Sequence, residues 1–130
     1  MALSADFLRG YTDTIILNQL RKADSYGYEI TKRISALSGG ALDLKEATLY
    51  TAFRRMENSG YIISYWGNEG SGPRRRYYSI TVEGRNKLAE DQLAWKETRQ
   101  ALDALLGDEN DGEDLLGIHD ERIPVIRVEE

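Results

Sequence analysis

Arginine side chains recur within one segment of the chain, Lys45–Thr81, at spacings that suit anion binding. Arg54 and Arg55 form a pair, and Arg74–Arg76 form a run of three. Guanidinium groups present several N–H donors in one plane, and they bind phosphates and guanine edges well. From Lys45 to Lys87 the sequence holds eight basic and four acidic residues, a net charge of +4. This chemistry favours a phosphate-rich partner such as duplex DNA.

The charge of the whole chain argues against a phosphate-rich partner, because its 130 residues carry a formal net charge of −5. Residues 107–130 account for this excess, since nine acidic residues stand there against Arg122 and Arg127. The other residues carry a net charge of +2. A phosphate responds mainly to charges within a Debye length, about 10 Å, so the local balance matters most. The acidic total does not exclude binding to DNA.

Cysteine and histidine, which many catalytic and metal sites use, are absent or nearly absent from the sequence. It has no cysteine, which excludes disulfides, zinc–thiolate sites and thiol catalysis. His119 is the only histidine, and it lies in the acidic C-terminal segment. We find no phosphate-binding loop, dinucleotide fingerprint or metal-ligand cluster, so we expect no enzyme, cofactor or metal. No apolar run approaches the roughly 18 residues of a membrane span. The N-terminal residues also lack the pattern of a secretory signal, and we expect a cytoplasmic protein.

A helix is expected over Glu46–Ser59, with Gly60 at its end. Leu49, Phe53 and Met56 recur at helical spacing and should pack inward on one face. The opposite face should then turn polar and basic side chains toward solvent. We expect this exposed face to hold Thr48, Thr51, Arg54, Arg55 and Asn58, with Ala47 near them.

A β-hairpin should follow this helix. Tyr61–Trp66 and Arg74–Thr81 have the aromatic and β-branched content of strands. The seven residues between them, GNEGSGP, include three glycines and a proline and predict a loop. Because Arg74–Arg76 begin the second strand, the hairpin is expected to be basic where it leaves the loop.

Two helices should precede this unit. The first is expected over Phe7–Arg21, with Ser4 or Asp6 as its cap. The second is expected over Gly27–Leu37, and Gly39–Gly40 should stop it because glycine accepts left-handed backbone. The order helix, helix, helix, hairpin is that of a winged helix-turn-helix, whose third helix enters the major groove.

A long fourth helix is predicted after the hairpin, with Thr81 as its cap. In it Leu88, Trp95 and Leu102 are seven residues apart, and Leu105 continues the stripe. This spacing is typical of a helix that pairs with another helix, here in a homodimer. The sequence thus predicts a mainly α (α+β) fold: a winged-helix domain at 1–81, a C-terminal dimerisation helix at 82–107 and an acidic tail at 108–130.

Duplex contacts follow from this architecture. Thr48 and Thr51 can touch base edges or thymine methyl groups, and Arg54 and Arg55 can reach phosphates or guanine. Tyr50 lies at the flank, where its hydroxyl can bond a phosphate while its ring packs. The alternative is that the arginines are solvated surface and Tyr50 is core. The predicted DNA-binding set is Lys45, Thr48, Tyr50, Thr51, Arg54, Arg55, Arg74, Arg75 and Arg76.

Over residues 8–106 the sequence resembles the PadR family of bacterial transcriptional regulators. The matching pieces are SYGYEI at Ser25–Ile30, ATLYTAFRRMENSGYI at Ala47–Ile62, SYWG at Ser64–Gly67 and GPRRRYYSIT at Gly72–Thr81. The chain looks most similar to the smaller subgroup with a single C-terminal dimerisation helix, which includes the multidrug-sensing repressors of lactococci.

This resemblance implies a homodimeric repressor on a roughly palindromic operator. The family's DNA-contact positions fall on Tyr50, on Arg54 or Arg55, and on Arg74–Arg76. The sequence departs from the family at Lys45, where many members carry a small capping residue. A lysine there can add a phosphate contact at some cost in helix capping.

The resemblance also implies an effector site at the dimer axis. In the multidrug-sensing members a tryptophan at the Trp95 position comes from each subunit, and the two rings sandwich flat aromatic compounds. Asp13 and Asp91 would favour a cationic compound. The alternative is that Trp95 simply fills the dimer seam. The positions that match the cavity are Asp13, Thr14, Leu17, Asp91, Gln92, Trp95 and Arg99.

Two questions stay open at this point. The rival to a DNA-binding repressor is a winged helix used for protein association, whose basic face meets an acidic partner without sequence-specific DNA binding. The tail at 108–130 has three candidate roles: a solvated segment, a mask for the basic wing, or a strand (RIPVIRVEE) that packs on a sheet edge or on the partner subunit.

Overall fold

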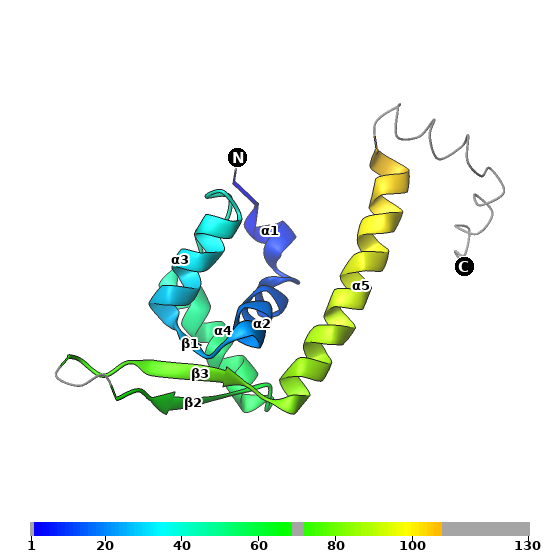
Figure 1. Cartoon of the computed structure of the whole chain (residues 1–130). Helices are drawn as coiled ribbons and strands as arrows, with labels where there is room; N and C mark the ends of the chain where they lie inside the picture. The colour runs from blue at the N-terminus through cyan, green and yellow to red at the C-terminus, as the bar shows by residue number, and fades with distance from the viewer. Residues whose placement is uncertain (1, 69–71, 108–130) are drawn as a thin grey trace. The chain divides into compact units, whose positions relative to one another are not determined.

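The computed structural model describes residues 2–68 and 72–107 (Figure 1). The predicted tail at 108–130, including His119, therefore lies outside the described residues. The chain divides into two compact units, residues 1–91 and 92–130. The predicted domain boundaries at 81 and 107 stay predictions. The elements in chain order are α1 (Ala5–Leu8), α2 (Thr12–Lys22), β1 (Ser25–Tyr26), α3 (Gly27–Leu37), α4 (Glu46–Asn58), β2 (Ile62–Trp66), β3 (Arg76–Ile80) and α5 (Val82–Leu106).

The first unit has the expected winged-helix order, and most of its local signals are confirmed. Gly39 and Gly40 have φ values of 63° and 83° and end α3. The Oγ1 of Thr81 accepts from the backbone N–H of Gly84 at 3.0 Å and caps α5. None of the helices in the described ranges is long and apolar enough for a membrane span.

The single helix expected over Phe7–Arg21 is wrong. The structure has α1 and α2 there, separated by a turn at Arg9–Tyr11. In this turn the N–H of Tyr11 donates to the carbonyl of Leu8, a bond of three-residue span in place of the helical four. Gly10 lies in this turn, without the left-handed φ that would require a glycine. Ser4 caps α1 by accepting from the N–H of Phe7 at 3.1 Å.

The sheet has three antiparallel strands in the order β1–β3–β2. Tyr77 pairs with Tyr26 on one side and with Tyr65 on the other. The expected hairpin is present, although β3 begins at Arg76 and not at Arg74. The two-residue β1 was not expected, because so short a strand has no pattern of its own and exists through its pairing with β3.

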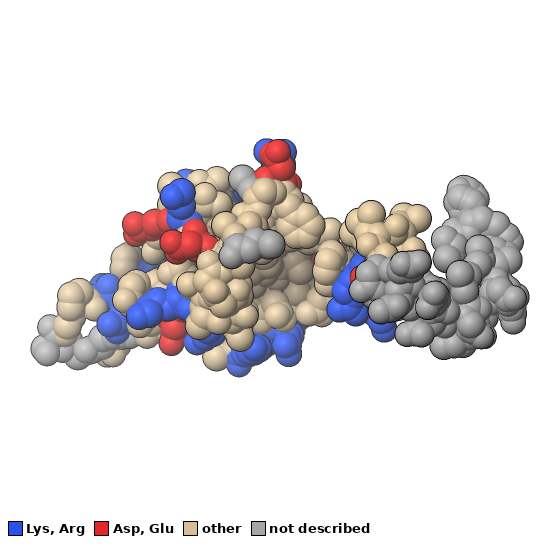
Figure 2. Space-filling model, turned by 90° about the horizontal axis from the view of Figure 1, so that it is seen from above, with Lys and Arg blue, Asp and Glu red and all other residues tan. Residues whose placement is uncertain are grey.

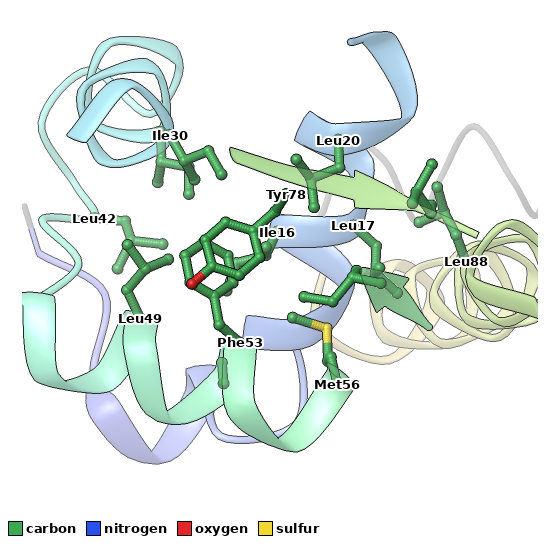
Figure 3. Packing of buried hydrophobic residues seen from close by; sticks show 14 residues of the cluster. Ile16, Leu17, Leu20, Ile30, Leu42, Leu49, Phe53, Met56, Tyr78 and Leu88 are labelled. Carbon is green, nitrogen blue, oxygen red and sulfur yellow. The ribbon is translucent and has the colours of Figure 1, made fainter. Parts of the chain in front are cut away.

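The core lies between the helices of the first unit and one face of the sheet (Figure 3). Leu49, Phe53 and Met56 are each 1% exposed, which confirms the predicted inner face of α4. The ring of Phe53 stacks on that of Tyr78 at 3.8 Å between centroids. This stack joins α4 to β3 and so positions the exposed face of α4 beside the wing. The remaining core residues are Ile16, Leu17, Leu20, Ile30, Ile34, Leu42, Ala52, Ile62, Ile80 and Leu88.

Candidate nucleic-acid interface

The outward face of α4 is polar and basic, as predicted. Its five predicted side chains, Thr48, Thr51, Arg54, Arg55 and Asn58, are all exposed. Lys45 occupies the N-cap position with extended backbone and makes no side-chain capping bond. A helix start without a side-chain cap leaves N–H groups for solvent or an incoming anion. A pocket of about 710 Å³ lies between one side of this helix, the N-terminal segment and the loop before α4, and Lys45, Thr48, Thr51 and Arg55 are among its lining residues.

Tyr50 is partly packed and partly exposed. Its ring makes an edge contact with Phe53 at 5.5 Å between centroids, yet the residue is 39% exposed. Its hydroxyl lies over the start of α3, where an added Cβ at Gly27 would be 2.5 Å from the hydroxyl oxygen. The close approach explains a glycine at this helix start, and part of Tyr50 remains exposed to solvent.

Arg54 and Arg55 differ in their surroundings. The Nε of Arg55 donates to Oδ2 of Asp13 at 3.3 Å, and its Nη2 donates to Oδ1 of the same carboxylate. These hydrogen bonds from Arg55 to Asp13 raise the pKa of Arg55 above its ordinary value. Asp13 was predicted as an effector residue, and the structure places it against a predicted DNA contact. The pair offsets the charge of Arg55 and ties α4 to α2.

The three wing arginines lie over aromatic rings. The guanidinium carbons of Arg74 and Arg76 are 5.3 Å and 5.5 Å from the ring centroid of Trp66. That of Arg75 is 4.8 Å from the ring of Tyr26. Cation–π contacts of this kind hold the charges near the protein surface. The wing extends to the left in Figure 1, and Figure 2 shows basic side chains close to its tip.

Sequence reasoning did not assign Trp66 or Tyr26 to this interface. The alternation of side chains along extended backbone was the available signal, because it turns Arg75 to the opposite side from Arg74 and Arg76. Trp66 is 52% exposed, so an indole lies at the surface in contact with two arginines.

Some of the predicted effector residues do converge. Asp13, Thr14 and Asp91 line a polar pocket of about 270 Å³, together with Arg55 and Lys87. The Oγ1 of Thr14 donates to Oδ2 of Asp91 at 3.0 Å, and Nζ of Lys87 donates to its Oδ1 at 3.1 Å. The hydrogen bond to Asp91 raises the pKa of Lys87. Within residues 2–68 and 72–107 no group of three or more potential metal ligands occurs.

Other predicted effector and dimer residues lie elsewhere. Leu17 is completely buried in the core, so its side chain presents no surface to a ligand. Leu88 is 2% exposed and packs within its own chain, which leaves almost no surface for the expected contact with a second copy. Leu102 and Leu105 are 38% and 73% exposed on α5. Gln92, Trp95 and Arg99 belong to the second unit, where Trp95 is partly buried.

Residues 16–90 match the model of the transcriptional regulator PadR-like family. A transcriptional regulator from Clostridium thermocellum has a similar solved structure: TM-score 0.72, 44% identity, covering 78% of this chain and 99% of that one. A PadR family transcription regulator from Clostridium difficile R20291 is 39% identical with a TM-score of 0.67, over 75% of this chain and all (100%) of that one. An uncharacterised protein of Lysinibacillus sphaericus is 38% identical over 102 residues, 78% of this chain and 94% of its own length.

Proposed function

The chain belongs to the PadR-like family of transcriptional regulators, and from that premise we propose that it is a homodimeric repressor relieved by a small planar effector. Its family makes it a transcription regulator with a winged-helix fold, and not an enzyme. Repression, the homodimer and the effector are the parts that we add.

The observation that carries the proposal is the exposed basic face of α4 beside an arginine-bearing wing. We propose that α4 enters the major groove and that the wing follows the backbone, as in other winged helices. The side chains in contact would be Lys45, Thr48, Tyr50, Thr51, Arg54, Arg74, Arg75 and Arg76, whereas Arg55 is paired with Asp13. A symmetric dimer would then read two half-sites about 34 Å apart, one turn of DNA.

Exposed leucines on α5 support the homodimer. Leu93, Leu102, Leu105 and Leu106 are 58%, 38%, 73% and 75% exposed. A helix that leaves large apolar side chains in water gains free energy when a second copy covers them. We propose that Trp95, Leu102 and Leu105 form this seam, while Leu88 anchors the start of α5 to its own domain.

A selection experiment tests DNA recognition directly. The purified protein is incubated with a randomised duplex library, and the enriched sequences are titrated against random duplex at several salt concentrations. We expect a roughly palindromic sequence to be preferred by about 10³-fold or more, with log K falling steeply as log salt rises.

The absence of any enriched sequence would contradict the repressor and favour the rival function. In that case the basic face would serve an acidic protein partner, and binding to duplex would be weak and independent of sequence.

The effector half of the proposal has its own test. The carboxylates of Asp13 and Asp91 are already bonded to Arg55 and Lys87, so they offer a cation less free charge than the sequence suggested. We therefore propose a planar aromatic effector between the two Trp95 rings of the dimer, held mainly by stacking.

In a Trp66→Phe variant, where Trp95 is the only tryptophan, planar aromatic dyes are expected to quench fluorescence with saturation. The same dyes should release labelled operator from the protein. A second variant that carries Trp95→Leu in addition to Trp66→Phe should still bind operator, but the dyes should no longer release it. Equal release from both variants would rule out the Trp95 site.

A further inference from the structure

A chain of polar side chains joins the last turn of α4 to the base of the wing. The Nη2 of Arg76 donates to Oγ of Ser64 at 2.8 Å. The Oγ of Ser64 in turn donates to Oε2 of Glu57 at 2.6 Å. A hydroxyl has one proton and two lone pairs. Its donation to Glu57 therefore leaves lone pairs for Arg76, and the carboxylate on α4 orients the acceptor that holds the arginine.

Strand register explains why a serine can do this. Ser64 pairs with Tyr78, and Trp66 pairs with Arg76 two positions further along the ladder. The Ser64 hydroxyl is thus diagonal to Arg76 on the same face of the sheet, a distance that a long side chain can span. A serine is short enough to leave room for the guanidinium, and its position places it over the end of α4.

Two aromatic side chains complete the surroundings of Arg76. Its guanidinium carbon is 5.5 Å from the ring of Trp66. Burial raises the pKa of the Tyr78 hydroxyl, while the charge of Arg76 and a hydrogen bond from it act in the opposite direction. Arg76 is therefore held by Ser64 and Trp66, and it still lies on the exposed surface. Its remaining N–H donors can reach a phosphate.

We propose that Ser64 and Glu57 are positioning residues for DNA binding. They hold the Arg76 guanidinium at a fixed place relative to α4, so that the helix and the base of the wing meet the duplex as one rigid unit. Ordering a long side chain on binding costs conformational entropy, and this network removes that cost before DNA arrives. The proposal rests on the proposed function, and it adds residues that touch no DNA themselves.

The test uses the operator found by selection and the full chain. Ser64→Ala is expected to weaken operator binding roughly five- to tenfold, within the range for losing one typical protein hydrogen bond. The slope of log K against log salt should stay the same, because Arg76 still reaches its phosphate. Ser64→Thr should bind operator as tightly as the unchanged protein, because threonine keeps the hydroxyl.

The matched control is Ser79→Ala. Ser79 lies on β3 opposite Ile63, one position from the Ser64–Tyr78 pair and so on the other face of the sheet. The Ser79→Ala protein should bind operator as tightly as the unchanged protein does. The melting temperatures of Ser64→Ala and Ser79→Ala should lie within a few degrees of each other. Glu57→Ala should weaken binding in the same direction as Ser64→Ala. The double variant should lose no more than the worse single variant, because both act through one chain of bonds.

Two results would overturn the proposal while the repressor stands: a Ser64→Ala protein that binds as tightly as the unchanged one, or a Ser64→Thr protein as weak as Ser64→Ala. Selection of no operator by the unchanged protein would remove the proposed function first, and the positioning role with it.

Discussion

Replacing Arg54 by alanine is expected to weaken operator binding about 10- to 100-fold, the usual effect of losing one arginine that reads a base. Arg54 is exposed on α4, three residues after Thr51 and so on the same side of the helix. Arg55 is engaged by Asp13 on α2. We therefore expect Arg54 to make the major contact with DNA and Arg55 to fix α4 against its neighbour.

The matched control removes the ion pair as a unit. An Asp13→Ala/Arg55→Ala double variant keeps the net charge and leaves neither partner alone. It should bind operator within about threefold of the unchanged protein, and it should lose at most about 1 kcal/mol of stability because the pair is partly exposed. Anisotropy titrations with labelled duplex at several salt concentrations measure all three proteins. A double variant as weak as Arg54→Ala would make Arg55 the contact instead.

Replacing Gly84 by alanine is expected to lower the free energy of unfolding by about 3 kcal/mol, at the upper end for overpacked sites. An added Cβ would lie 2.1 Å from the carbonyl oxygen of Tyr61 and 2.8 Å from Cγ1 of Ile80. That carbonyl cannot easily move, because it accepts from the backbone N–H of Thr81 at 3.0 Å. The start of α5 is thus pressed against the base of the wing, and only glycine fits.

Helix propensity alone predicts the opposite sign, since alanine in a helix is favoured over glycine by about 1 kcal/mol. The cost of the steric clash should exceed this gain in helix propensity, and the melting temperature should fall by roughly 10–20 °C for a domain of this size. Gly10→Ala is the control, because no atom lies within 4 Å of its added Cβ. It should change stability by less than about 0.5 kcal/mol. Thermal unfolding followed by circular dichroism compares the two, and equal melting temperatures would refute the close contact.

Local signals in the sequence were reliable where the physics is local. The inner face of α4, the glycine stop after α3 and the cap at Thr81 each depend on residues within one or two turns. The same kind of signal failed at Gly10, where a single glycine does not reveal whether a helix continues or breaks. The predicted contact set on α4 followed from helical periodicity, and its exposure is confirmed.

The stripe of Leu88, Trp95 and Leu102 shows where periodicity stops being informative. The sequence treats the three positions alike, yet Leu88 is buried in the core and Leu102 is 38% exposed. Spacing tells which side chains share a face of a helix, but it does not tell what covers each part of that face. That depends on where the neighbouring elements end.

By itself the sequence determined the order of the helices and the hairpin, apart from the split into α1 and α2 and the short β1. It also determined the basic face of α4 and the arginines of the wing, because periodicity, caps and local charge are properties of neighbouring residues. Only the tertiary structure decided which of these charges have partners. Asp13 and Arg55 are 42 residues apart in the chain, and Glu57, Ser64 and Arg76 come from three different elements. Such partners meet only because helix packing and strand register bring them within reach, and no pattern along the chain encodes those distances.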